Sequence, residues 1–267
     1  MKRSILAATL GILVANNAFA QLTTITDTTL GTSTRDGTLN AGEYGSLTYF
    51  SGGVNSGFGN VLFGSGGKLY WDSSLGGALN LGLQLGGGTQ NGNDAGVIYI
   101  DSVAGGFNNT TTINDIQDGG RAAISGNGSF GGSSELTFAS GFNADYAISI
   151  QSGFAGLFQL ASGGSGSLIF VTSLSLTPTG AGPQQREGAL LLSNVGLSFG
   201  GSFKLNPDNA FRSNELNGDA YAGGNIGQSP FTVTGYNVFQ SVPEPSSLTL
   251  LALGGLCAAR LWHRRRA

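Results

Sequence analysis

The stretch Leu79-Asn80-Leu81-Gly82-Leu83-Gln84-Leu85 places a leucine at every second position. Successive side chains of a β-strand point to opposite faces of the sheet, so the four leucines would share one face. Asn80, Gly82 and Gln84 would share the other. The pattern therefore predicts a strand with one buried and one polar face, and it is the clearest of several similar runs in the chain.

Other runs with short apolar or alternating patterns are separated by Gly-, Asn- and Ser-rich connections, which favour turns. We expect further strands at Leu47–Phe50, Val61–Phe63, Lys68–Trp71, Val97–Ile100, Arg121–Ile124, Glu135–Phe138, Tyr146–Ile150, Gly156–Leu160, Ala189–Leu192, Val195–Phe199 and Phe231–Val233. The run Ser167–Leu176 begins with four consecutive apolar residues, which predicts a central strand buried on both faces. Asn206–Arg212 is a candidate for one helical turn.

The body of the chain, residues 21–240, is predicted to be all-β. Gly accounts for 47 of the 267 residues and Pro for 6, so glycine supplies tight turns without a collagen-like or Pro-rich pattern. Many short strands with frequent turns favour a two-layer, jelly-roll-like β-sandwich. A β-solenoid is the alternative fold, although the Gly-Gly pairs recur without a fixed period.

The N-terminus has the order of features of a secretory signal peptide. Lys2 and Arg3 precede the apolar run Ile5–Ala15, and Ala18-Phe19-Ala20 precedes Gln21. Signal peptidase cuts after such small-x-small triplets, so residues 1–20 are predicted to be removed, with Ala18, Ala20 and Gln21 at the cleavage site.

The C-terminal segment 241–267 joins three unlike elements. Pro243-Glu244-Pro245 is followed by an apolar run, and the chain closes with Arg264-Arg265-Arg266 and an alanine. The segment from Ser246 to Trp262 has seventeen residues, the lower limit of what crosses a bilayer as a helix, and the arginines would stay on the cytoplasmic side. We therefore expect one C-terminal transmembrane helix.

This segment resembles the PEP-CTERM sorting signal of Gram-negative bacteria. The resemblance implies processing by an exosortase, a membrane-embedded transpeptidase, at or near Pro243-Glu244-Pro245. It also implies a protein that is exported, anchored through its C-terminus, and then displayed on the cell surface or released, often in bacteria that make exopolysaccharide. A plain tail-anchored protein is the alternative.

Composition excludes several kinds of function for the body. Residues 21–240 contain six basic and fourteen acidic residues, a net charge of −8, which disfavours nucleic-acid binding. The only histidine, His263, and the only cysteine, Cys257, lie in the tail, so the body has no triad, thiol nucleophile or imidazole metal ligand. We expect no cofactor and no metal site. Asn91-Gly92-Asn93-Asp94, Asn114-Asp115 and Asp118-Gly119 are interpreted as turns rather than calcium loops.

Sugars stack on aromatic rings that have polar neighbours. The candidate glycan-binding residues, which can equally be core residues of strands, are Tyr70, Trp71, Asp72, Tyr99, Asp145 and Tyr146. In addition, Asp36–Tyr44 resembles the opening motif of DOMON-like sandwiches and family nine carbohydrate-binding modules, with Leu69–Trp71 and Val97–Asp101 at the places of their core strands.

Three functions therefore remain open for the body. The first is a non-catalytic extracellular domain that binds glycans or takes part in the cell-envelope matrix. The second is a secreted glycan-active enzyme that uses carboxylates alone, and the third is a structural or adhesive solenoid. The candidate carboxylates for the second are Glu43, Asp72, Asp101, Glu135, Asp145 and Glu187, but their spacing selects no pair.

We predict that the exported protein begins at Gln21, because signal peptidase cuts after Ala20. N-terminal sequencing of the protein recovered outside the cytoplasm measures this directly. An exported form that begins at Met1 would contradict it.

Overall fold

The computed structural model describes residues 23–27, 32–44, 46–49, 68–74, 76–84, 94–126, 135–151, 153–177, 185–198, 202–205, 211–213, 220–221, 224–225, 231–232 and 236–240. The predicted signal peptide, the expected strand Val61–Phe63, the loop 91–93 and the tail 241–267 lie outside these residues. Within the described ranges, no helix is both long and apolar enough to span a membrane.

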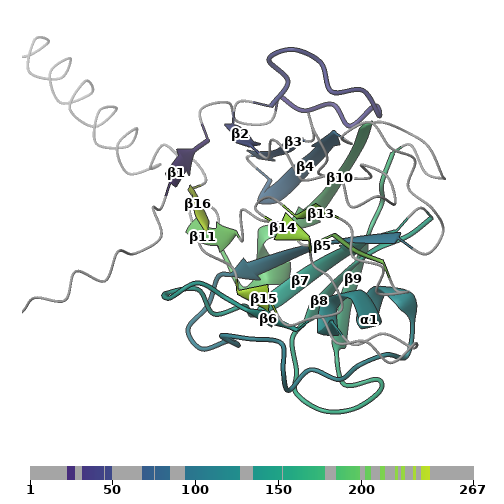
Figure 1. Cartoon of the computed structure of the whole chain (residues 1–267). Helices are drawn as coiled ribbons and strands as arrows, with labels where there is room; N and C mark the ends of the chain where they lie inside the picture. The colour runs from purple at the N-terminus through teal and green to yellow at the C-terminus, as the bar shows by residue number, and fades with distance from the viewer. Residues whose placement is uncertain are drawn as a thin grey trace, which may run out of the picture.

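Most of the described strands belong to two sheets (Figure 1). The large sheet has the order β1-β16-β11-β5-β7-β8-β9, and β12 also pairs with β5. Its strands are β1 Thr23–Thr26, β16 Asn237–Gln240, β11 Ser202–Leu205, β5 Asp94–Asp101, β7 Tyr146–Ile150, β8 Ala155–Gln159, β9 Ile169–Leu174 and β12 Phe211–Ser213. All neighbours are antiparallel except β1 and β16, which run parallel.

The small sheet has the order β10-β4-β3-β2 and is antiparallel throughout. Its strands are β10 Gln185–Leu191, β4 Ala78–Gln84, β3 Lys68–Ser73 and β2 Ser46–Tyr49. Two minor pairs complete the described strands, namely β13 Ala220–Tyr221 with β14 Gly224–Asn225, and β15 Phe231–Thr232 with β6 Leu136–Thr137. The strands pair into packed sheets rather than into the stacked rungs of a solenoid.

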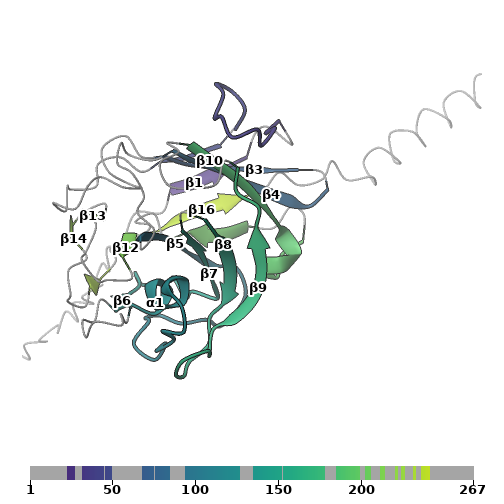
Figure 2. The same cartoon turned by 90° about the vertical axis from the view of Figure 1, so that its right-hand side faces the viewer.

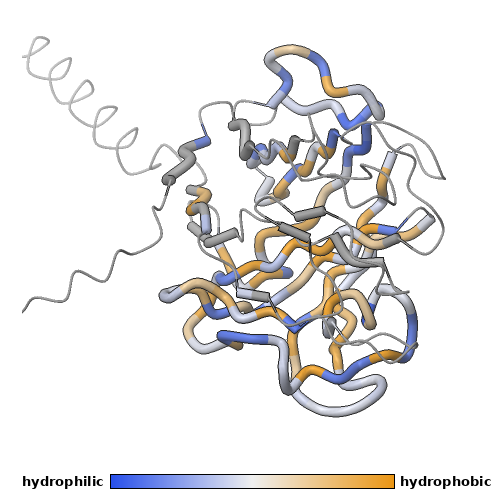
Figure 3. Tube along the Cα trace, viewed as in Figure 1, coloured by the Kyte–Doolittle hydropathy of each residue, from blue (hydrophilic) through white to orange (hydrophobic). Residues whose placement is uncertain are grey.

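The inner core lies between the two sheets. Leu79, Leu81 and Leu83 of β4 are fully buried in one cluster with Ile98 and Ile148 of the large sheet. The four-leucine pattern is thus confirmed for the three leucines that the structure describes. Figure 3 shows how apolar residues recur along the strands that enclose this core.

A second core covers the opposite face of the large sheet, so the body has three layers rather than the expected two. Val97, Tyr99 and Ala147 of the large sheet pack there against Ile124 and Phe138. The covering layer consists of the helix α1, Gly119–Ser125, and of the irregular segments around it (Figure 2). Because both faces are covered, the central strands β5 and β7 are buried along almost their whole length.

The expected strand at Arg121–Ile124 is wrong, because these residues form most of α1. Asp118 caps the helix by accepting a hydrogen bond from the Arg121 backbone N–H, and Gly126 ends it with a left-handed φ of 77°. Both capping residues stand in the sequence at the positions where helices begin and end. A four-residue alternation is too short to outweigh such caps.

The expected central strand at Ser167–Leu176 is also wrong in its placement. β9 is the edge of the large sheet, and the side chains of Ile169 and Phe170 are 53% and 48% exposed. The pairing of β8 with β9 shifts between Leu157 and Phe158. Ile169 and Phe170 are consecutive and point to opposite faces of the sheet, so neither face of this part of the edge strand is fully covered. Leu168 and Leu174 are nevertheless buried.

Two further expectations fail locally. The expected strand Val195–Phe199 begins inside the 3-10 helix η1, Leu192–Val195, which ends at Gly196. Asn206–Arg212 was a candidate helical turn, but Phe211 and Arg212 belong to strand β12 and the rest lies outside the described residues. The strand expected at Tyr146–Ile150 is confirmed with the same bounds. The strands expected at Leu47–Phe50, Lys68–Trp71, Val97–Ile100, Glu135–Phe138, Gly156–Leu160, Ala189–Leu192 and Phe231–Val233 are confirmed with other bounds.

Replacing Leu81 with Ala should lower the free energy of unfolding by about 2–5 kcal/mol, because the side chain is fully buried between the sheets. Leu191→Ala is the matched control, since Leu191 is 51% exposed and its truncation should cost less than about 0.5 kcal/mol. Urea denaturation followed by fluorescence measures both values. Equal losses in the two variants would contradict the assignment of the inner core.

Candidate functional site

The predicted sorting and cleavage residues lie outside the described part of the chain. They are Pro243, Glu244, Pro245, Arg264, Arg265 and Arg266 of the tail, and Ala18, Ala20 and Gln21 at the N-terminus. The functional geometry of the body therefore has to be sought among its own side chains.

Two of the predicted glycan-binding aromatic residues are core residues. Trp71 is 0% exposed and its ring lies 6.5 Å from that of Phe239 in the inner core. Tyr99 is 0% exposed in the second core, where its hydroxyl donates a hydrogen bond to the carbonyl oxygen of Ile124 at 2.6 Å. Neither ring has an open face on which a sugar can stack, so the prediction for these two residues has no support in the structure.

The other four predicted residues lie in two separate places. Tyr70 and Asp72 share the outer face of the small sheet, where the ring of Tyr70 is 5.7 Å from that of Tyr44. Asp145 and Tyr146 lie at the start of β7 in the large sheet. The structure thus brings Tyr70 and Asp72 together but does not assemble the six residues into one site.

The outer face of the small sheet is covered by residues 32–44, which we call the cover loop. Glu43 holds this loop together, because its carboxylate accepts hydrogen bonds from the backbone N–H and hydroxyl of Thr34 at 2.6 and 2.5 Å. It also accepts from the backbone N–H of Asn40 at 2.9 Å. The sequence motif Asp36–Tyr44 therefore has a structural role here, in which its glutamate fixes the loop.

Two carboxylates of the small sheet fasten the cover loop from below. Glu187 accepts from the backbone N–H groups of Gly37 and Thr38 at 2.5 and 3.1 Å and from the Tyr44 hydroxyl at 2.9 Å. Asp72 accepts from the backbone N–H and hydroxyl of Ser33. The loop approaches the sheet so closely that a Cβ on Gly82 would lie 2.6 Å from a methyl carbon of Leu39.

Four more buried carboxylates bind backbone N–H groups in the same way. Asp101 accepts from Asn143, and Asp145 accepts from Ser102 and Val103. Asp27 accepts from Ser73 at 2.6 Å. Asp115 accepts from Gln117, Gly166 and Leu168 and pairs with the Arg121 guanidinium at 2.8 Å. We call the seven the anchoring carboxylates: Asp27, Glu43, Asp72, Asp101, Asp115, Asp145 and Glu187.

Burial and hydrogen bonding shift the pKa values of these groups in opposite directions. Burial disfavours the charged form of Glu43, but the hydrogen bonds from Thr34 and Asn40 outweigh it and lower the pKa. Asp115 has a lowered pKa for the same reason, through Gly166, Gln117, Leu168 and Arg121. Burial prevails at Asp72 and Glu187 and raises their pKa values. Burial, and then the bond to Glu187, raise the pKa of Tyr44.

The anchoring carboxylates include five of the six acids that the sequence offered for catalysis, Glu135 being the exception. Their oxygens accept backbone hydrogen bonds that the loops need. Asp115 and Asp118 contact the protein rather than forming a calcium loop, since Asp118 caps α1. Among the described residues, no three His, Cys, Asp or Glu side chains gather where they could hold a metal ion.

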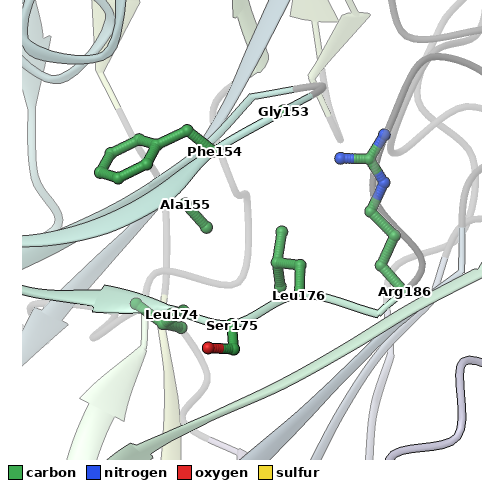
Figure 4. A pocket seen from close by; sticks show the side chains of 7 residues that line it. All are labelled: Gly153, Phe154, Ala155, Leu174, Ser175, Leu176 and Arg186. Carbon is green, nitrogen blue, oxygen red and sulfur yellow. The ribbon is translucent and has the colours of Figure 1, made fainter.

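The described surface does contain two hollows along the line where the sheets meet, which we call the seam. The seam lies between β9, an edge of the large sheet, and β10, an edge of the small sheet. Thr177 and Glu187 exchange two backbone hydrogen bonds of 2.8 Å at one end. One hollow of about 270 Å³ lies beside this junction, with Phe154, Leu176 and Arg186 in its lining (Figure 4).

The second hollow, of about 300 Å³, continues along the same two strands. Thr172 and Ser173 of β9 line one side, Leu190 and Leu191 of β10 the other, and Arg35 of the cover loop is part of the wall. Neither Arg35 nor Arg186 belongs to a sequence pattern that indicates a binding site. Arg186 lies in the polar first half of β10, which precedes the expected strand Ala189–Leu192.

Replacing Glu43 with Gln should lower the free energy of unfolding by about 1–3 kcal/mol at about pH 7, because the neutral amide cannot replace both carboxylate oxygens as acceptors. The folded-state pKa of Glu43 is lowered, so the stabilisation is present above its ordinary pKa of 4.5 and is lost as the pH falls through the folded value. Urea denaturation at about pH 7 and about pH 3 should therefore show the variant and wild type converging in acid. Glu135→Gln, outside the set of anchoring carboxylates, is the control; a difference for Glu43→Gln that is constant with pH would contradict the assignment.

In comparisons with known proteins, only the tail of the chain matches a known family. Residues 241–266 match the PEP-CTERM protein-sorting motif. No curated protein and no solved structure matches the chain, so the likeness of the body to DOMON-like sandwiches is not supported. The chain therefore carries at its C-terminus the PEP-CTERM motif, as exported proteins processed by exosortase do.

Proposed function

We propose that the chain is exported, held in the membrane by residues 246–262, and cut by an exosortase at or near Pro243-Glu244-Pro245. The observation that carries this proposal is the match of residues 241–266 to the sorting motif. The processed body is then displayed on the cell surface or released outside the cell. Signal peptidase removes residues 1–20 on the way.

The physical chemistry of the tail supports this order of events. The apolar run is at the short limit for crossing a bilayer and contains Gly254-Gly255, so its hold on the membrane is weak. The three terminal arginines oppose complete translocation. The two prolines keep the preceding backbone extended, which is the form that a processing enzyme binds.

For the body we propose a non-catalytic role in binding polysaccharide. This proposal is supported by the role of the carboxylates. Seven buried acids, among them five candidates for acid–base catalysis, hold loops and strands together. An enzyme of the carboxylate type would need two acids facing each other across an open cleft, about 5–9.5 Å apart. The seam instead offers hydroxyl groups, an exposed phenylalanine and cationic side chains.

Replacing Pro243 and Pro245 with Ala should leave the protein in the membrane but block its maturation, because the junction can then continue the helix. Replacing Arg264, Arg265 and Arg266 with Gln should weaken membrane retention. Mass spectrometry of the C-terminus, in hosts with and without the exosortase, measures both effects. Val242→Ala is the control that should mature normally. Surface protein that keeps residues 246–267 in both hosts would establish plain tail anchoring instead.

A further inference from the structure

The two hollows of the seam lie next to each other along the same two strands, and we treat them as one groove. Leu174 to Leu176 line the first hollow, and the preceding residues of the chain, Thr172 and Ser173, line the second. On the facing strand, Arg186 lines one hollow and Ala189 to Leu191 the other. The two segments are joined at Thr177 and Glu187, and the hollows follow one another beside this junction, an arrangement that suits a chain-like ligand.

The groove is positively charged on an acidic body. The body has fourteen acidic and only six basic residues, yet two of the six, Arg35 and Arg186, line the groove. The described lining contains no Asp or Glu. Arg35 is exposed and can touch a ligand, whereas Arg186 is buried beneath the groove, where its Nη1 donates to the carbonyl oxygen of Gln151. Charge complementarity therefore favours an anionic occupant.

The backbone of Arg35 gives an independent indication of function. Its φ of 56° lies in the left-handed region, and it is the one non-glycine residue with a positive φ in the described part of the chain. Glycine adopts this conformation without a steric cost, as Gly37 and Gly42 do in the same loop. A strained arginine where glycine would be more stable is typical of a side chain that is kept for a purpose.

The remaining groups of the groove suit a sugar. Thr172, Ser173 and Ser175 supply hydroxyl groups that can bond the hydroxyls of a saccharide. Phe154, 45% exposed at the rim, offers a ring face for stacking, and the exposed Phe170 ring lies 6.4 Å from it. An acidic peptide would instead add to a regular strand edge, but the pairing of β9 is irregular.

We propose that the seam binds an acidic polysaccharide, with Arg35 pairing directly with a uronate carboxylate and Phe154 stacking on a sugar ring. This inference rests on the proposed role of the body in binding polysaccharide and specifies both the place and the charge of the ligand. Neutral polymers should bind more weakly than acidic ones, and added salt should weaken the binding of acidic ones.

The test measures retention of the purified exported protein on polygalacturonate and on the same polymer with its carboxyl groups methyl-esterified. Arg35→Gly should bind the acidic polymer about tenfold more weakly, the usual effect of losing one charge-assisted hydrogen bond. Its thermal midpoint should be unchanged or higher by about 2–4 °C, because glycine relieves the backbone. Arg35→Lys should retain most of the binding.

Thr112→Glu is the matched control, since it alters net charge by the same amount at an exposed position that is not part of the groove. Its affinity should stay within about twofold of wild type, as expected for a distant surface charge. Thr172→Lys adds a cation inside the groove and should strengthen binding of the acidic polymer only.

Each contrary outcome removes a distinct part of the proposal. Equal binding of the esterified polymer, or full binding by Arg35→Gly, overturns the seam assignment while leaving polysaccharide binding intact. Tighter binding of polyglutamate than of polygalacturonate overturns the choice of a sugar. Retention on neither polymer, nor on a panel of neutral glycans, removes the polysaccharide-binding function itself.

Discussion

The structure depends on buried carboxylates that accept hydrogen bonds from backbone N–H groups of distant segments. A buried N–H without a partner costs about 1–3 kcal/mol, and long irregular segments contain many of them. Disulfides and imidazole–metal sites are excluded, because the body has neither cysteine nor histidine. One carboxylate can satisfy two or three donors at once, as Asp115 does for Gln117, Gly166 and Leu168. Acidic side chains thus take the place of covalent links in this exported protein.

These contacts also connect the layers of the fold. Glu187 and Asp72 fasten the cover loop to the small sheet, and the loop in turn carries Arg35 to the edge of β10. Asp101, at the end of β5, binds the backbone N–H of Asn143 just before β7. Asp145, just before β7, binds the backbone N–H of Ser102 just after β5. The carboxylates that position the seam, such as Glu187 and Asp72, are therefore also candidates for catalytic acids in the sequence. Because they are buried and hydrogen-bonded to the backbone, they stabilise the fold instead.

Strands with clear alternation of apolar and polar residues could be predicted from the sequence, because this pattern lies within the strand itself and requires only that one face is buried. β4 and β7 are examples. Placement within a sheet could not be predicted, since the apolar run of β9 looks the same whether the strand is central or at an edge. The bonds of the anchoring carboxylates were equally hidden: Ser33 and Asp72 are 39 positions apart, and Gly37 and Glu187 are 150 apart. The seam arises only when two sheet edges meet in space.

The parallel pairing of β1 with β16 joins the first described strand of the body to the last one before the tail. If the chain crosses the membrane from its N-terminus, β1 cannot pair with β16 until residues 237–240 have crossed. The closing pair of the large sheet then forms as the sorting segment reaches the bilayer. Gln240 is three residues from Pro243, a span of at most about 10 Å. Completion of the large sheet is thereby tied to the late emergence of the segment that adjoins the sorting motif.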